Sequence, residues 1–97
     1  MNTITVSELK DLKNPLIIDI RDNFNYNNSH IPSAINIPEL ILKEMPARYL
    51  SKNNTYYLYC SIGKQSLILS NYLNTIGYHC YSLEGGYQEY RRNLEIY

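Results

Sequence analysis

The sequence predicts an α/β fold in a single domain, residues 1–97, with a parallel sheet covered by helices on both faces. Short apolar runs alternate with helix-like segments along the whole chain, which is typical of successive strand–helix crossovers. The run from Leu16 to Ile20 is nearly continuous in apolar, mostly β-branched residues, as expected of a strand buried on both faces. With 97 residues and 44% apolar content, the chain can bury one modest core.

The first segments set up this alternation. Ile4 to Val6 is predicted to form a short strand, and Ser7 is predicted to cap a helix of about six residues that ends near Pro15. The buried strand Leu16 to Ile20 follows. It contains a single charged residue, Asp19, for which we expect a partner because a buried charge is costly when it is unpaired.

The next segment, Arg21 to Ser29, is polar and rich in asparagine, which predicts a loop. We expect Phe24 and Tyr26 to anchor this loop to the core. Ile35 to Ile37 lies between two prolines and is a further short strand candidate.

The second half of the chain continues the same alternation. Its strand candidates are Tyr56 to Cys60 and His79 to Leu83. Its helix candidates are Glu39 to Leu50 with an interruption at Pro46, Ser66 to Ile76 with Gly77 as the residue after the helix, and a terminal helix from Tyr87 to Tyr97 that follows the Gly85-Gly86 turn.

Charge and cysteine content exclude several classes of function. Nine basic residues balance nine acidic ones, so we expect neither nucleic acid nor a membrane surface as a partner. The first ten residues lack the pattern of a secretory signal, and no apolar run approaches the roughly 20 residues of a membrane span. Cys60 and Cys80 are far apart, which predicts no disulfide framework, no metal site and no cofactor. We expect a cytoplasmic monomer.

The stretch "YCSIGKQS" places Cys60 where a nucleophile would be expected. In a parallel α/β sheet the ligand crevice lies beyond the carboxyl ends of the strands, and Cys60 ends a predicted strand. A short loop, Ser61 to Gln65, then leads to the helix that begins at Ser66, whose first amides and positive dipole favour an anion. Helix N-termini and nearby cations lower the pKa of a free thiol. Gly63 and Lys64 add a tight turn and a local cation, which favour a nucleophilic role for Cys60. The alternative is that Cys60 only fills the core, as buried free cysteines often do.

Two longer stretches carry a resemblance to a known family. The stretch "YCSIGKQSLILSNYLNTIGYHCYSLEGGYQEY" resembles the active-site half of a single-domain rhodanese-like protein, which has a Cys-x-x-Gly-x-Arg-Ser loop, a helix, a Gly-Tyr, a strand and a Gly-Gly turn. The stretch "LIIDIRDNFNYNNSHIPSAINIP" resembles that family's Asp-Val-Arg strand end and its Gly-His-Ile-Pro-Gly-Ala segment. Both occur in the family's order, and together they cover nearly the whole chain.

This resemblance implies a three-layer α/β/α fold with a five-stranded parallel sheet, and sulfur transfer through a cysteine persulfide. Cys60 would take a sulfane sulfur from a small donor such as thiosulfate and pass it to cyanide, a thiol or a protein acceptor. Asp19 and Arg21 would support the neighbouring strand ends. The residues whose amides would cradle the persulfide are Ser61, Ile62, Gly63, Lys64, Gln65 and Ser66.

Departures from the family pattern leave alternatives open. Gln65 occupies the place of the loop arginine of many members, which puts the use of thiosulfate in question, and Ser29 and Ser33 replace two glycines. A rhodanese-like module that only binds a partner is the main alternative. A phosphatase of the same broad fold would need Cys-x5-Arg, in which the arginine holds the phosphoryl group, but the sixth residue after Cys60 is Ser66.

The other candidate nucleophile and the two histidines are predicted to be structural. Cys80 lies in a β-rich run with no nearby cation, so we expect it in the core, with a role as resolving cysteine as the alternative. A Cys-His catalytic pair would require His30 or His79 beside Cys60.

Overall fold

The structure is a computed structural model that describes residues 2–94, and these form a five-stranded sheet in which every neighbouring pair is parallel. The strands are β1 Thr3–Ile4, β2 Leu16–Asp19, β3 Ile35–Asn36, β4 Thr55–Tyr59 and β5 His79–Leu83. Their order in the sheet is β1-β5-β4-β2-β3. Asp19 lies opposite Tyr59 in the register, so β2 and β4 end level with each other and Cys60 follows at the same edge of the sheet as Ile20.

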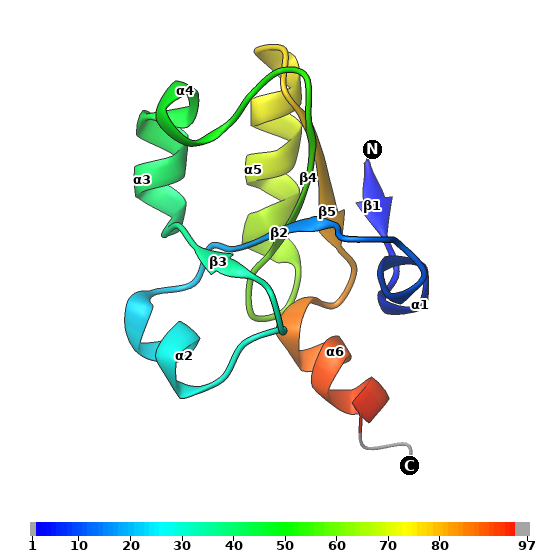
Figure 1. The fold of residues 1–97 in the computed structure, drawn as a ribbon. Helices are drawn as coiled ribbons and strands as arrows, with labels where there is room; N and C mark the ends of the chain where they lie inside the picture. The colour runs from blue at the N-terminus through cyan, green and yellow to red at the C-terminus, as the bar shows by residue number, and fades with distance from the viewer. Residues whose placement is uncertain (1, 95–97) are drawn as a thin grey trace.

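Helices cover both faces of the sheet. Those within residues 2–94 are α1 Val6–Lys10, α2 Asn23–Asn28, α3 Glu39–Glu44, α4 Pro46–Tyr49, α5 Lys64–Thr75 and α6 Gly86–Leu94. Figure 1 shows α1 and α6 on one side of the sheet, and α3 with α4 beside α5 on the other. One apolar core lies under α3 and α5 and includes Leu69 and Leu73, and a second contains Val6 and Leu9 of α1. The predicted three-layer α/β/α fold is therefore confirmed.

Strand β4 directs Cys60 to one of these two cores. Successive side chains of a strand point to opposite faces of the sheet. Tyr56 and Leu58 belong to the core under α3 and α5, whereas Tyr59 belongs to the core beside α1. Cys60 is the next residue after Tyr59 and returns to the α5 side, where the sulfur meets the beginning of that helix.

Helix α1 begins earlier than the sequence suggested. The cap is Thr5, whose hydroxyl accepts from the Glu8 amide at 3.1 Å, while the Glu8 carboxylate accepts from the Thr5 amide at 2.9 Å. The prediction that Ser7 caps the helix is wrong, because Thr5 and Glu8 form this reciprocal capping box two residues earlier. For the same reason β1 ends at Ile4 instead of Val6.

The predicted loop from Arg21 to Ser29 contains helix α2, so that prediction is wrong. Asp22 caps the helix by accepting from the Asn25 amide at 2.8 Å, and this cap outweighs the poor helix propensity of asparagine. Tyr26 is an anchor as expected, since its hydroxyl donates to the Ala34 carbonyl at 2.6 Å. Phe24 is not, because it is 80% exposed.

The remaining boundaries differ by small shifts. The predicted interruption at Pro46 is present, since α3 and α4 are separate helices and Pro46 is the first residue of α4. Helix α5 begins at Lys64, two residues before the expected Ser66, and ends at Thr75. The predicted terminal helix is described as far as Leu94, and Tyr97 lies outside the described residues.

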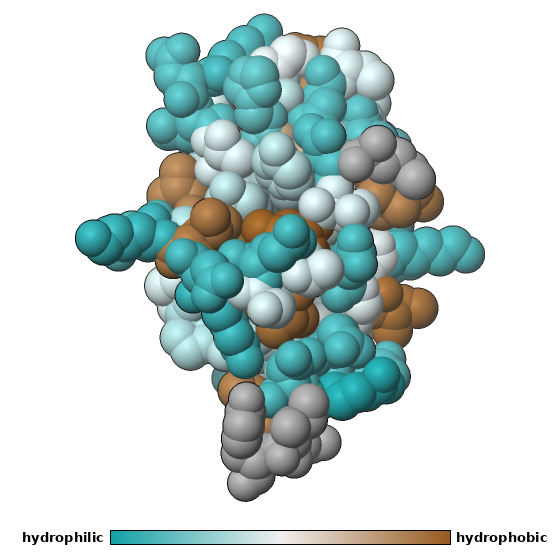
Figure 2. Space-filling view, turned by 90° about the vertical axis from the view of Figure 1, so that its right-hand side faces the viewer, coloured by the Kyte–Doolittle hydropathy of each residue, from teal (hydrophilic) through white to brown (hydrophobic). Residues whose placement is uncertain are grey.

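The surface shows no broad apolar region on the side that includes β1 and α1. Figure 2 shows this face as mostly hydrophilic, with hydrophobic residues in separate patches, as on ordinary protein surfaces. None of the helices within residues 2–94 has the length and apolar character that a membrane span requires.

Candidate active site

The sulfur of Cys60 lies against the first turn of α5. It accepts hydrogen bonds from the Gly63 amide at 3.1 Å and from the Ser66 amide at 3.3 Å, and the thiol donates to the Ser66 hydroxyl at 3.3 Å. Because α5 begins at Lys64, the amide of Ser66 is one of the first helix amides, which have no partner within the helix. The residue before the helix, Gly63, has no side chain to cap it, so the sulfur of Cys60 provides the acceptor.

Gly63 gives the loop the shape that this contact needs. Its φ angle of +96° lies in the left-handed region, which residues with a side chain rarely adopt. In this turn the amide of Gly63 donates to the sulfur of Cys60. A Cβ atom at this position would also lie only 3.0 Å from the Gly85 amide nitrogen, so a side chain there would press on the chain that leads into α6.

The beginning of α6 holds the Cys60 loop from the other side. The Tyr87 amide donates to the Cys60 carbonyl at 2.8 Å, and the Gln88 amide donates to the Ser61 carbonyl at 3.0 Å. Gly86, with a φ of +60°, approaches the loop so closely that an added Cβ would lie 2.5 Å from the Cys60 carbonyl oxygen. The sequence predicted only a turn here. The sequence signal for this contact was the Gly85-Gly86 pair, in which Gly86 has to be a glycine because it touches the loop.

Ser82 of β5 is a further residue near the sulfur that the sequence did not suggest. Its hydroxyl lies 2.7 Å from the hydroxyl of Ser66, and both residues are almost completely buried. Ser66 therefore connects the sulfur of Cys60 to β5, an interior strand of the sheet. A polar residue inside the apolar run of β5 was the only sequence signal for this contact.

Asp19 and Arg21 form a buried ion pair at the end of β2. The Arg21 guanidinium donates to both carboxylate oxygens of Asp19, with the shortest distance 2.7 Å, and also to the Ser29 carbonyl at 2.7 Å. Its carbon Cζ lies 4.3 Å from the centre of the Tyr87 ring. Burial alone would lower the pKa of Arg21, but the hydrogen bonds and charge of Asp19 raise it. The pair links β2, the chain after α2 and α6 at the edge of the sheet where Cys60 lies.

A cavity of about 460 Å³ opens beside Cys60. The expected loop residues Ser61, Ile62 and Gln65 line it, so the residue in the place of the family's arginine faces the site. Lys64, which we expected to supply a local cation, is exposed and is not among the lining residues. The other lining residues are Ile20, Arg21, Asp22, Asn25 and Glu39, of which only Arg21 was expected at the site.

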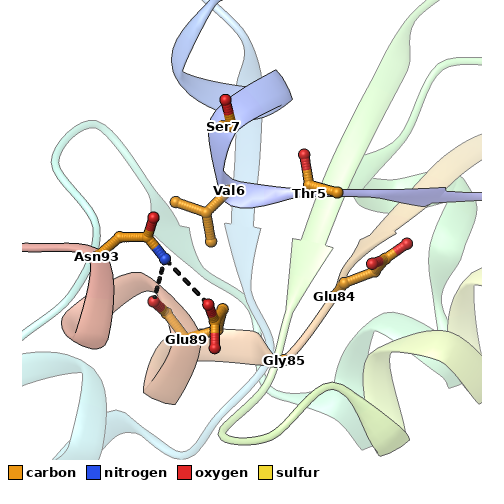
Figure 3. A pocket seen from close by; sticks show the side chains of 7 residues that line it. All are labelled: Thr5, Val6, Ser7, Glu84, Gly85, Glu89 and Asn93. Carbon is orange, nitrogen blue, oxygen red and sulfur yellow. Dashed lines mark hydrogen bonds between the residues drawn. The ribbon is translucent and has the colours of Figure 1, made fainter.

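A second cavity, of about 370 Å³, lies between α1, the end of β5 and α6 (Figure 3). Its lining contains neither cysteine nor histidine. Its carboxylates already have partners: Asn93 donates to the Glu89 side chain at 3.1 Å, and Thr3 donates to Glu84 at 2.8 Å. The cavity beside Cys60 is therefore the better candidate for a reactive site.

The other candidate residues lie apart from this chemistry. Cys80 is fully buried in the core as predicted, and burial raises the pKa of its thiol to about 12. The His30 ring bonds the Tyr26 carbonyl at 2.8 Å, and His79 is exposed on β5. Neither histidine lines the Cys60 cavity. Within residues 2–94, no three Asp, Glu, His or Cys side chains are grouped as metal ligands would be.

A family model for the rhodanese-like domain matches residues 5–93. The chain belongs to the rhodanese-like domain family. It is 30% identical to the thiosulfate sulfurtransferase GlpE of Tolumonas auensis, over 86% of this chain and 78% of that protein. It is also 30% identical to the adenylyltransferase and sulfurtransferase uba4 of Ogataea parapolymorpha, over 95% of this chain. The chain spans between 16% and 24% of the length of three curated relatives, uba4 among them.

Solved structures agree with this assignment. The crystal structure of a rhodanese-like domain protein from Staphylococcus aureus superposes with a TM-score of 0.83 at 30% identity. The match covers 92% of this chain and 90% of that one. This rhodanese-like domain therefore has sulfurtransferases among its sequence relatives, and its fold matches that of a solved rhodanese-like domain protein.

Proposed function

We propose that this domain is a sulfurtransferase that carries a sulfane sulfur as a persulfide on Cys60. The observation that supports this most directly is the set of donors around the sulfur: the amides of Gly63 and Ser66 point at it from the start of a helix of 12 residues. Such donors stabilise negative charge on the sulfur, both before and after it takes up a second sulfur atom. The adjacent cavity gives a donor molecule access to it.

The proposed reaction has two displacement steps. The thiolate of Cys60 attacks the outer sulfur of the donor, so that a new S–S bond forms while the donor's bond to that sulfur breaks and its electron pair leaves with the remainder of the donor. An acceptor thiolate or cyanide then attacks the outer sulfur of the persulfide. The S–S bond to Cys60 breaks, and its electron pair returns to the cysteine sulfur. No external oxidant or reductant is needed.

One feature of the site favours sulfur over phosphate as the transferred group. The position at which a phosphatase would have its arginine is Ser66, which is buried and hydrogen-bonded to Ser82. It has no cationic fork with which to hold a phosphoryl group. We further propose that the domain acts as a monomer. We also propose a reducing compartment such as the cytoplasm, because Cys60 has to stay a free thiol to react.

Intact-mass measurement tests the proposal. After incubation with thiosulfate, mercaptopyruvate or a polysulfide, the wild-type domain should gain one sulfur atom and lose it again on treatment with cyanide. A Cys60→Ser variant should gain none, whereas the matched control Cys80→Ser should behave as wild type. If the wild type stays unmodified with all three donors, the proposal is wrong, and a module that only binds a partner becomes the better description.

A further inference from the structure

The charged residues around the Cys60 cavity do not suit an anionic donor. Three charged side chains line it: Arg21, Asp22 and Glu39. The charge of Arg21 is matched by the buried carboxylate of Asp19, which it contacts at 2.7 Å. The two other lining charges are carboxylates, so the cavity as a whole presents negative charge to an incoming molecule.

Glu39 is placed to exert most of this effect. Its amide donates to the Ile20 carbonyl at 3.0 Å, which fixes the first residue of α3 beside the end of β2. Its side chain is partly buried, so solvent screens it less than the exposed Asp22. Among residues 2–94, no cation lies within ion-pair distance of its carboxylate.

Within the described part of the chain, the cations near these carboxylates form no ion pair with them. Lys43 follows Glu39 by one turn on α3 and shares a small neighbouring pocket with it, but its Nζ lies toward the Tyr72 ring, 5.8 Å from the ring centre. Lys64 is exposed outside the lining. Gln65 fills the place at the cavity where an arginine would supply a fork of donors. The positive end of α5 remains, where the amides of Gly63 and Ser66 are already bonded to the sulfur of Cys60.

The rest of the lining suits an organic group. Ile20 and Ile62 provide aliphatic surface, and Ile62 is 59% exposed. Asn25, Ser61 and Gln65 provide neutral polar groups. Apolar surface with a few polar groups is the usual lining of sites for small organic molecules.

We propose that Glu39 selects the sulfur donor by charge, so that the domain prefers organic persulfides with a neutral or cationic organic group over dianions such as thiosulfate. This inference rests on the proposed function of Cys60. In the step concerned, the Cys60 thiolate attacks the outer sulfur of R–S–S–H. The bond between the two donor sulfurs breaks, the electron pair leaves as R–S⁻, and the persulfide Cys60–S–S–H is formed.

A series of donors that differ in charge provides the test. The rate at which Cys60 gains one sulfur is measured by mass spectrometry with thiosulfate and with the persulfides of 3-mercaptopropionate, 2-mercaptoethanol and cysteamine. We expect the rate to rise from the anionic to the cationic donor among the three persulfides. Glu39→Gln should raise the rate with thiosulfate roughly three- to tenfold, the effect of removing one partly screened charge near a dianion.

A matched variant separates this effect from a general effect on α3. Glu44→Gln removes an exposed carboxylate from the other end of the same helix, and it should leave the order of the donors unchanged. Asp22→Asn removes the second lining charge while keeping a good helix cap, and it serves as the test if Glu39→Gln does not fold. It should raise the rate with thiosulfate by a smaller factor than expected for Glu39→Gln.

The outcomes distinguish the two proposals. If no donor modifies Cys60, the proposed sulfur transfer is wrong. If all donors modify Cys60 at rates that do not depend on their charge, or if thiosulfate is fastest, sulfur transfer stands and selection by Glu39 is overturned. The same holds if Glu39→Gln and Glu44→Gln have equal effects on the rate with thiosulfate.

Discussion

Replacing Gly86 with alanine is expected to disturb the Cys60 loop, which the beginning of α6 contacts. The new Cβ would lie 2.5 Å from the Cys60 carbonyl oxygen, 2.7 Å from the Gly63 nitrogen and 2.8 Å from the Ile62 nitrogen. All three are backbone atoms, so none can move aside by a change of side-chain rotamer. Relief requires the loop and the start of α6 to separate, which would weaken the 2.8 Å bond from the Tyr87 amide to the Cys60 carbonyl.

The cost has two parts. A residue with a side chain in the left-handed region loses about 1–2 kcal/mol relative to glycine, and Gly86 has a φ of +60°. Forcing an additional carbon into a filled space costs about 1–3 kcal/mol more. We therefore expect Gly86→Ala to lower the free energy of unfolding in urea by roughly 2–5 kcal/mol. A loop displaced by about 1 Å should also slow persulfide formation on Cys60, on the order of 10²-fold.

Gly77→Ala is the matched control. Gly77 has an even less favourable φ of +103° for alanine, but its added Cβ would meet only the flexible side chain of Lys52, at 3.2 Å or more. This variant should lose stability through the backbone alone and keep the wild-type rate at Cys60. If Gly86→Ala loses no more stability than Gly77→Ala, or if it reacts as fast as wild type, the contact between Gly86 and the loop does not have the role assigned to it.

Four further predictions concern buried or lining side chains. The Ser70 hydroxyl is buried without a hydrogen-bond partner among residues 2–94, so Ser70→Ala should raise the melting temperature by about 4–8 °C, or about 1 kcal/mol; a lower melting temperature would argue against this. Ser66→Ala should lower the unfolding free energy by about 1–3 kcal/mol, because it leaves the Ser82 hydroxyl unpaired, whereas Ser82→Ala should lower it by only about 1 kcal/mol, because the Ser66 hydroxyl keeps its bonds with the Cys60 thiol and the Gly63 carbonyl; the double variant should lose clearly less than the sum, and additive losses would speak against the pair. Burial raises the pKa of Cys80 to about 12, above the roughly 8.5 of an unfolded thiol, so its contribution to stability is complete below pH 8.5 and declines as the pH rises toward 12. Unfolding measured between pH 8.5 and 10 should show this slope, at most about 1.4 kcal/mol per pH unit, and Cys80→Ala should reduce it; an unchanged slope would contradict the assignment. Finally, Gln65→Arg should speed persulfide formation with thiosulfate more than with the 2-mercaptoethanol persulfide, since Gln65 lines the cavity, and equal effects would count against this reasoning.

The architecture could be predicted from the sequence because apolar runs and helical periodicity mark its main strands and helices. The apolar run Leu16 to Ile18 is typical of a strand in a covered sheet, and the run after Cys60 has a helical period. The same patterns placed Cys60 at the carboxyl end of a strand and next to a helix N-terminus. Helix α2 was missed because its formation depends on the Asp22 cap and on the contact of Tyr26 with Ala34, and neither is visible in local propensity.

The residues of the candidate site that were missed all come from distant parts of the chain. Ser82 reaches Ser66 only because β5 lies beside β4 in the sheet, and Gly86 reaches the Cys60 loop because α6 begins beneath it. Glu39 lines the cavity because its amide bonds to Ile20 at the end of β2. These contacts join residues that are far apart in the sequence, so no local pattern indicates them. The Cys60 loop is one continuous segment and could be predicted, whereas the residues around it could not.

The two outermost strands, β1 and β3, contain two residues each. A long exposed edge strand offers unpaired amides and carbonyls on which a strand of another molecule can assemble, and very short edges are one way in which proteins avoid this. As the structure describes them, the borders of this sheet are too brief for such addition. Growth of the sheet from one molecule into the next is therefore disfavoured, and we expect any stable association of this domain to use side chains on its helices and loops.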